Sequence, residues 1–306
     1  MASLKAIRRR ISSAKSTQQI TRALKLVSAA RLRRAQEALT NSLPYSDALA
    51  RVADSLLTSE GISVGPVENA QKRSMLVVVA SDRGLAGGYN SYLLRAAEAT
   101  RGEIRAAGLE VELFAVGKKA VDHFRRSGVP VALSRVDNLP RLATIALARD
   151  IAARMLADYS SGAVDEAGIV YTHFQSAITQ KPLYERLLPV KPPGDTGIQA
   201  GASVDAAAST SDAPKIEAPQ IDYLVEPSRA ELVPVVLRGY LEAAVYHALL
   251  EAEASEEGAR MTAMDSATNN AGEMIQQLTL DMNRARQAMI TRELMEIVAG
   301  AEALRG

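Results

Sequence analysis

The chain has 306 residues, with 36 Lys and Arg against 35 Asp and Glu, so no global field favours nucleic acid. It contains no Cys, which excludes a disulfide framework, a thiol nucleophile and a Cys-ligated zinc site. The length allows about two domains, and no uninterrupted apolar run reaches the roughly 18 residues that span a bilayer.

Residues 1–60 are predicted to form one long helix. Residues 1–36 carry ten Lys or Arg, no Asp or Glu, and neither Pro nor Gly. Pro44 is expected to bend the helix, because it lacks an amide proton and disfavours helix at the preceding residue. Apolar residues recur at coiled-coil spacings of three and four. They are Leu4, Ile7, Ile11, Ala14, Ile20, Leu24, Val27, Leu49, Val52 and Leu56.

Residues 75–190 alternate between short apolar runs and helical segments. The run Met75–Ala80 is apolar throughout, as expected of a strand that is buried on both faces. This alternation predicts a small doubly wound α/β domain. Its strands are predicted at 75–80, 111–116, 129–133, 168–174 and 184–190, and its helices at 89–107, 118–126 and 143–159.

The last third of the chain contains an insertion and a second long helix. Residues 191–219 are rich in Pro, Gly, Ala, Ser, Thr and Asp and have too few large apolar side chains to form a core, which predicts a disordered insertion. Residues 228–304 are predicted to be helical, with Ser228 and Glu231 forming a capping box at the start. Their apolar stripe comprises Ala271, Met274, Leu278, Met282, Ala285, Met289, Leu294, Ile297, Ala301 and Leu304. Long helices at both ends of the chain predict an antiparallel coiled coil of the termini.

The sequence nominates no catalytic site. Residues 81–90 follow a strand and open a helix, which is where doubly wound sheets bind phosphate. The glycine spacing matches neither the dinucleotide fingerprint nor the P-loop, which favours a tight structural turn. His123, His173 and His247 are widely separated in the sequence and lack metal-ligand or triad spacing. We therefore expect no catalytic residue, no metal and no cofactor in this chain.

The basic N-terminal helix allows three interpretations. A solvated helix face is the commonest one, although ten positive charges along one helix repel each other. The same charges suit DNA, or an acidic protein surface. An Arg-rich, acid-poor start also fits an organellar transit peptide, but the helical pattern continues past Glu37 without a processing break.

Three stretches closely resemble the gamma subunit of F-type ATP synthases. They are Ile20–Gln36, Ser81–Gly88 and Asn283–Gly300, and the likeness extends through Asp222–Pro227 and Gly258–Met264. The resemblance implies a rotor shaft that couples proton-driven rotation of the c ring to conformational cycling of the catalytic beta subunits. It also implies that Mg-ATP is bound by the partner alpha and beta subunits rather than by this chain.

The resemblance further implies partners and site residues. The expected partners are the alpha-3-beta-3 hexamer, the epsilon subunit and the c ring, with no nucleic acid and with membrane contact only through the c ring. The expected location is peripheral, on the cytoplasmic side of the bacterial inner membrane. Matching motifs assign beta-subunit contacts to Arg286, Gln287 and Thr291, coupling to Leu24, Lys25 and Arg260, and c-ring footing to Tyr223 and Glu226.

Overall fold

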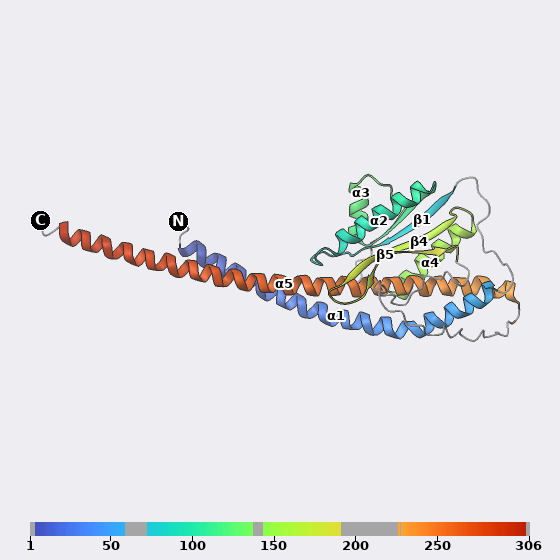
Figure 1. Ribbon diagram of the computed structural model, residues 1–306, viewed down its shortest axis with the longest axis horizontal. Helices are drawn as coiled ribbons and strands as arrows, with labels where there is room; N and C mark the ends of the chain where they lie inside the picture. Colours follow the sequence, from blue (N-terminus) through green and yellow to red (C-terminus); the bar gives the residue numbers. More distant parts are fainter. Residues whose placement is uncertain (1–3, 59–71, 137–142, 191–225, 227, 304–306) are drawn as a thin grey trace, which may run out of the picture. The chain divides into compact units, whose positions relative to one another are not determined.

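Two long helices, α1 (Leu4–Thr58) and α5 (Arg229–Ala303), are the most prominent elements of the computed structural model (Figure 1). Residues 4–58, 72–136, 143–190, 226 and 228–303 are described. The chain divides into two compact units, and both helices contribute to each. Unit 1 comprises residues 1–29 and 260–306, and unit 2 comprises residues 30–259. The coiled coil of the terminal helices is thus confirmed, whereas the predicted insertion at 191–219 lies outside the described residues.

Helix α1 continues through Pro44, and Figure 1 shows it bending in its second half. Side-chain hydroxyls there bond to carbonyl groups of the preceding turn. Ser42 Oγ donates to the Leu39 carbonyl at 2.8 Å, and Ser46 Oγ donates to the Ser42 carbonyl at 3.2 Å. Such bonds back to the helix are common where it bends, and they accompany the missing amide of Pro44.

Unit 2 contains a five-stranded sheet in the order β3-β2-β1-β4-β5. Its strands are β1 (Arg73–Val79), β2 (Glu110–Val116), β3 (Leu133–Arg135), β4 (Glu166–Phe174) and β5 (Gln180–Leu188). All neighbouring strands are parallel except β5, which pairs antiparallel with β4. In the central register, Val77 of β1 lies between Phe114 of β2 and Ile169 of β4.

Helices cover both faces of this sheet, as a doubly wound domain requires. One face packs against α2 (Tyr89–Ala106) and α3 (Lys118–Arg126), through residues such as Leu93 and Phe124. The other face packs against α4 (Ile145–Ser160) and against α5, through residues such as Ile151 and Leu241. Figure 1 shows α5 running beside the sheet on the side of α4.

The edge strands differ from their prediction. The third strand was expected at 129–133 but occupies 133–135. Pro130 lacks the amide proton that a strand needs for its hydrogen bonds, and Val129 and Val131 are partly buried against the core. The last strand was expected from Tyr184 but begins at Gln180, since the edge position of β5 tolerates Pro182.

One stretch of α5 is long and apolar enough to span a membrane by length and composition alone, with a mean hydropathy of 1.2 among the described residues. The same helix contributes Leu237, Leu241, Val245 and Leu249 to the sheet core. Burial accounts for part of this apolar character, since 39% of the apolar stretch is buried inside the protein.

Candidate functional site

The coiled coil of unit 1 has a seam with a seven-residue repeat, and the apolar stripe predicted on α1 matches it from Leu4 to Ala14 but not beyond. Buried and half-buried residues of α1 recur at Leu4, Ile7, Ile11, Ala14, Gln18, Thr21, Lys25 and Ser28. The α5 side comprises Met264, Thr268, Ala271, Ile275, Leu278, Met282 and Ala285. The prediction of Ile20 and Val27 as seam residues is wrong, because they are 57% and 48% exposed. Met274 is also outside the seam, at 55% exposure.

The middle of this seam is polar and hydrogen-bonded. Thr268 Oγ1 lies 2.8 Å from Thr21 Oγ1, and Thr268 also donates to the Met264 carbonyl at 2.7 Å. Gln18 Nε2 reaches the Thr268 carbonyl at 3.5 Å. A polar residue at a coiled-coil core position fixes the register at a cost in stability. These contacts therefore specify how the two helices align.

The three residues predicted to tune coupling have different environments. The Lys25 ammonium lies 2.6 Å from an Asp265 carboxylate oxygen, with both side chains partly exposed. Leu24 is half-buried beside the seam, and Arg260 is buried in α5. The structure thus pairs Lys25 across the coiled coil with an acid that motif matching missed. The seven-residue spacing from Ser28 back to Leu4 was the signal that could have found this polar seam.

The end of α5 presents a fully exposed surface. From Arg286 to Ala301 every described residue is exposed, including Arg286, Gln287 and Thr291. Several of these residues are large and apolar, among them Ile290, Met295, Ile297 and Val298. Clusters of exposed apolar side chains mark sites where another protein binds. This end of α5 therefore has the character of an interaction surface, and it contains all three predicted beta-subunit contacts.

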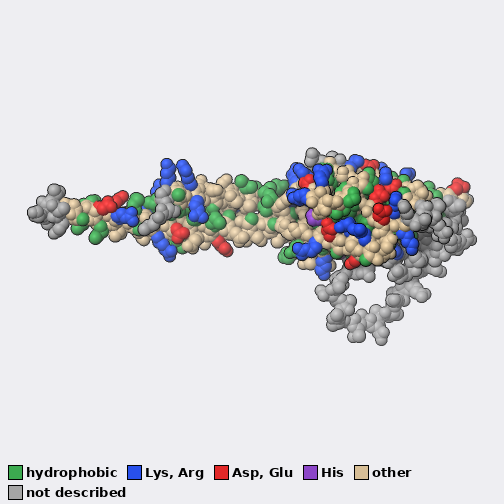
Figure 2. All heavy atoms as spheres, turned by 90° about the horizontal axis from the view of Figure 1, so that it is seen from above, with side chains coloured by type: hydrophobic (Ala, Val, Ile, Leu, Met, Phe, Trp, Pro, Cys, Tyr) green, Lys and Arg blue, Asp and Glu red, His purple; other side chains and the backbone are tan. Residues whose placement is uncertain are grey.

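The basic charge of α1 is partly used within the chain. Lys25 pairs with Asp265, Arg31 with Glu257 at 3.4 Å, and Arg33 with Glu37 at 3.0 Å. Figure 2 shows Lys and Arg side chains gathered on the coiled coil near the start of α1. The exposed basic residues of this stretch are Lys5, Arg8, Arg9, Arg10, Lys15 and Arg22. They leave a positive surface that suits an acidic partner.

The glycine turn after β1 is built from contacts within the protein. Ser81 Oγ donates to the Arg83 carbonyl at 2.6 Å and lies 3.0 Å from Asn90 Oδ1. Asp82 Oδ1 accepts from the Lys118 amide at 2.8 Å, so a carboxylate of the protein caps the start of α3. An anion bound there would face this carboxylate. These contacts fit the prediction of a structural turn.

Helix α5 occupies the crevice where doubly wound sheets bind ligands, at the carboxyl ends of β1 and β4. The Tyr89 hydroxyl, at the start of α2, donates to the Ala252 carbonyl at 3.3 Å. Ser255 Oγ donates to the carbonyl of Thr172, near the end of β4, at 2.9 Å. Within the described part of the chain, no group of three or more His, Asp or Glu side chains is arranged so that it could hold a metal ion.

Of the two residues predicted to form the c-ring footing, Glu226 is exposed and Tyr223 lies outside the described residues. His173 and His247, which are distant in the sequence, both contact one carboxylate, that of Glu251. The packing of β4 against α5 brings this pair together, although the two histidines are widely separated in the sequence.

The comparisons with known proteins agree with this architecture. A family model described as ATP synthase matches residues 3–304. The chain is 43% identical to the ATP synthase gamma chain of Moorella thermoacetica over 312 aligned residues, covering 100% of both chains. It is 41% identical to the gamma chain of Synechococcus sp., again over 100% of both chains.

Solved structures share the fold at low sequence identity. The rotor of the Euglena gracilis mitochondrial ATP synthase matches with a TM-score of 0.63 at 19% identity, covering 94% of this chain and 98% of that one. A chain of the central stalk and c ring of the Tetrahymena thermophila mitochondrial enzyme matches with a TM-score of 0.57 at 23% identity, covering 81% and 99%. Full-length identity above 40% to curated gamma chains, together with this fold, shows that the chain belongs to the ATP synthase gamma chain family.

Proposed function

We propose that the chain is the rotor shaft of an F-type ATP synthase. It couples proton-driven rotation of the c ring to conformational cycling of the catalytic beta subunits, which make ATP or, in reverse, hydrolyse it. The observation that carries this proposal is the exposed, apolar end of α5 in a family member whose helices form a coiled coil. Enclosure of that end by the alpha-3-beta-3 hexamer would bury side chains that water solvates poorly.

The partner contacts follow the motif assignment. Arg286, Gln287 and Thr291 bind a loop of a beta subunit, and Leu24, Lys25 and Arg260 tune the coupling. Tyr223 and Glu226 form the footing near the c ring, with the epsilon subunit close by. The exposed position of Arg286, Gln287 and Thr291 supports their role as contacts. The chain is then peripheral, on the cytoplasmic side of the inner membrane, and reaches the membrane only through the c ring.

Catalysis belongs to the partner subunits in this proposal, because the chain supplies differential contacts rather than chemistry. A partner shifts a conformational equilibrium only by its different affinity for the two states. An asymmetric coiled coil presents a different face to each of three equivalent beta subunits at every angle. Each beta subunit therefore passes through empty, loose and tight states as the shaft turns. Because binding linkage is reciprocal, nucleotide binding and hydrolysis turn the shaft in the opposite sense.

Isolation of the chain from membranes tests the proposal. We expect an affinity-tagged chain to recover alpha, beta, epsilon and c subunits, and the chain alone to show no ATPase activity and no bound nucleotide after gel filtration. Adding the chain to separated alpha and beta subunits should restore ATPase activity. Recovery of the folded chain without these subunits would contradict the proposal, as would a stoichiometric nucleotide on the isolated chain.

A further inference from the structure

A short stretch of α5, residues 251–257, is polar and yet buried against unit 2. Glu251, Glu253 and Glu257 are only 4%, 8% and 5% exposed, and Ser255 is fully buried. Carboxylates are rarely buried to this degree without partners. We name this stretch the polar segment of α5.

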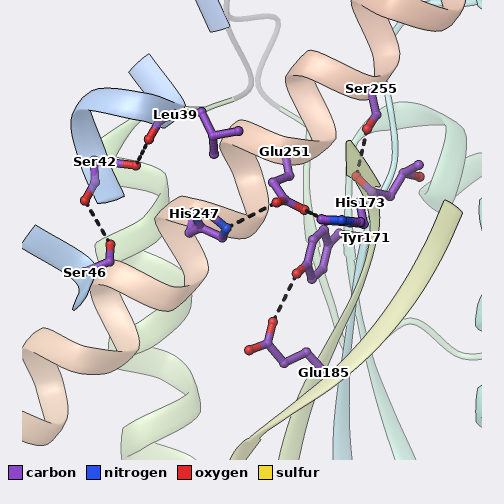
Figure 3. A network of polar contacts seen from close by, with 10 residues as sticks. Leu39, Ser42, Ser46, Tyr171, His173, Glu185, His247, Glu251 and Ser255 are labelled. Atoms are coloured by element: carbon purple, nitrogen blue, oxygen red, sulfur yellow. Dashed lines mark hydrogen bonds and ion pairs between the residues drawn. The ribbon is translucent and has the colours of Figure 1, made fainter. Parts of the chain in front are cut away.

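The first side of the polar segment contacts the sheet. Glu251 lies between two histidines, with one carboxylate oxygen 2.7 Å from His173 Nδ1 of β4 and the other 3.2 Å from His247 Nε2 (Figure 3). One turn further on, Ser255 Oγ donates to the Thr172 carbonyl of β4 at 2.9 Å. Glu251 and Ser255 thus attach the same side of α5 to the same strand.

The other sides of the polar segment contact three further elements. The Ala252 carbonyl accepts from the Tyr89 hydroxyl of α2, at 3.3 Å. Glu253 accepts from the Ala143 amide, just before α4, at 3.0 Å. Glu257 pairs with Arg31 of α1 at 3.4 Å.

These contacts surround the helix axis. Each residue of an α-helix advances about 100° around the axis, from 3.6 residues per turn. Glu251 and Ser255 therefore share one side, Ala252 faces a second side, and Glu253 and Glu257 share a third. Rotation of α5 about its own axis would break directional contacts on all three sides at once.

We propose that the polar segment forms a rigid connection, here called the joint, that prevents rotation of α5 about its own axis and so transmits torque between α5 and the sheet of unit 2. Glu251, with His173 and His247, is its main positioning group. The proposal rests on the proposed function, since only a chain that rotates carries torque. Apolar packing is non-directional. It therefore resists rotation of a packed helix about its own axis less than hydrogen bonds on three sides do.

The test of this joint distinguishes the thermal stability of the chain from the torsional stiffness of the joint. Replacing all the partners of a buried hydrogen-bonded group by apolar side chains of similar shape can be nearly neutral or stabilising. The triple substitution Glu251→Leu, His173→Leu, His247→Leu should therefore leave the thermal midpoint of the full chain unchanged or raised. The joint should nevertheless become torsionally softer, because the side that faces β4 keeps only the hydrogen bond from Ser255 to the Thr172 carbonyl.

Torsional stiffness is read from the angular fluctuations of a bead in the assembled complex. The chain has no Cys, so Gly102→Cys, at an exposed position of α2 with open space around it, gives a unique attachment point on unit 2. With the hexamer immobilised and arrested, we expect the triple variant to widen the angular variance by up to about 1.5-fold, since most of the contacts on one of three sides are lost. The matched control, Arg154→Ala with Asp158→Ala, removes a 2.6 Å ion pair within α4 and should leave the variance unchanged.

A milder pair, Glu251→Gln with Ser255→Ala, keeps the buried shape and should widen the variance in the same direction if the triple variant fails to assemble. Unchanged variance in an assembled variant, or equal widening in the Arg154 and Asp158 control, would overturn the joint. A wild-type complex that hydrolyses ATP while its bead stands still would instead overturn the proposed function, and the joint with it.

Discussion

At the scale of single residues, Gly117 shows how closely the elements around the glycine turn approach each other. Its φ of +88° lies in the left-handed region that side chains disfavour. A Cβ added there would lie 2.0 Å from the Ala80 carbonyl oxygen. Gly117 also donates its amide to the Arg135 carbonyl at 2.9 Å. The backbone just after β2 therefore lies so close to the end of β1 that residue 117 has no room for a side chain.

Substitution of this residue should destabilise unit 2. We expect Gly117→Ala to lower the free energy of unfolding by about 3 kcal/mol or more, from backbone strain and overpacking together. Denaturant unfolding of the full chain measures this. Gly102→Ala is the matched control, because open space surrounds that helical glycine. It should be stabilising by about 0.5–1 kcal/mol. Equal effects of the two substitutions would refute the argument.

Glu185 links the stability of unit 2 to pH. Burial raises the pKa of its carboxyl, while a hydrogen bond from the Tyr171 hydroxyl and the charge of His247 oppose the shift and Glu251 adds to it. A carboxyl with a raised pKa binds its proton more tightly in the folded chain than in the unfolded one. Its contribution is therefore favourable below the ordinary pKa of 4.5 and is lost as pH rises through the folded pKa.

Glu185→Gln removes this pH-dependent loss of stability, because an amide does not ionise. It also keeps an oxygen that can accept the hydrogen bond from the Tyr171 hydroxyl. We expect the variant to unfold at a higher temperature than wild type at neutral pH, with the two midpoints converging below pH 4.5. Thermal scans of the full chain at both pH values measure this. A difference that is constant with pH would show that Glu185 is ionised in the folded chain as readily as in the unfolded one.

At the scale of elements, the sequence predicts best where burial is apolar and complete. β1 is apolar and buried from Met75 to Val79, and α3 has the bounds that were predicted. The first half of the α1 seam, from Leu4 to Ala14, was predicted correctly. The second half was misassigned because Gln18, Thr21, Lys25 and Ser28 look like surface residues, whereas Ile20 and Val27 look like core residues. In a two-stranded coiled coil, the face of each helix that packs against the other helix depends on tertiary contacts that composition does not encode. The polar segment of α5 was missed for the same reason.

The exposed end of α5 carries a prediction of its own. Arg286→Ala with Gln287→Ala should lower the steady-state ATPase rate of the reconstituted complex by roughly ten- to a hundredfold, if hydrogen bonds worth about 1.5–3 kcal/mol act at the rate-limiting angle. Both side chains are exposed, so the helical content and assembly of the chain should not change.

The control for that pair is Arg284→Ala, which removes an exposed cation whose partner, Asp281, lies on the same helix. Its ATPase rate should remain close to wild type. Normal turnover of the double variant in a fully assembled complex would show that the motif assignment at these positions is wrong. Loss of helicity would show that the residues are structural.

At the scale of the whole molecule, the chain combines a coiled coil with a polar seam, an exposed helix end and a sheet domain attached to α5 by contacts on three sides. Together these features suit a chain that transmits mechanical work between partners. The fold was predictable from sequence, because long helices and apolar strands have strong periodic patterns. The family was predictable from the resemblance of three stretches of the sequence to gamma subunits. The side-chain contacts of the polar seam and of the polar segment of α5 were not.

The central claim is that this chain rotates as a shaft, and direct observation of rotation tests it. The measurement uses the complex of this chain with alpha and beta subunits, immobilised through the hexamer, with a bead attached at Gly102→Cys. We predict that addition of ATP turns the bead continuously in one direction, at a rate that follows ATP hydrolysis. Hydrolysis at the normal rate with a stationary or randomly fluctuating bead would contradict the account.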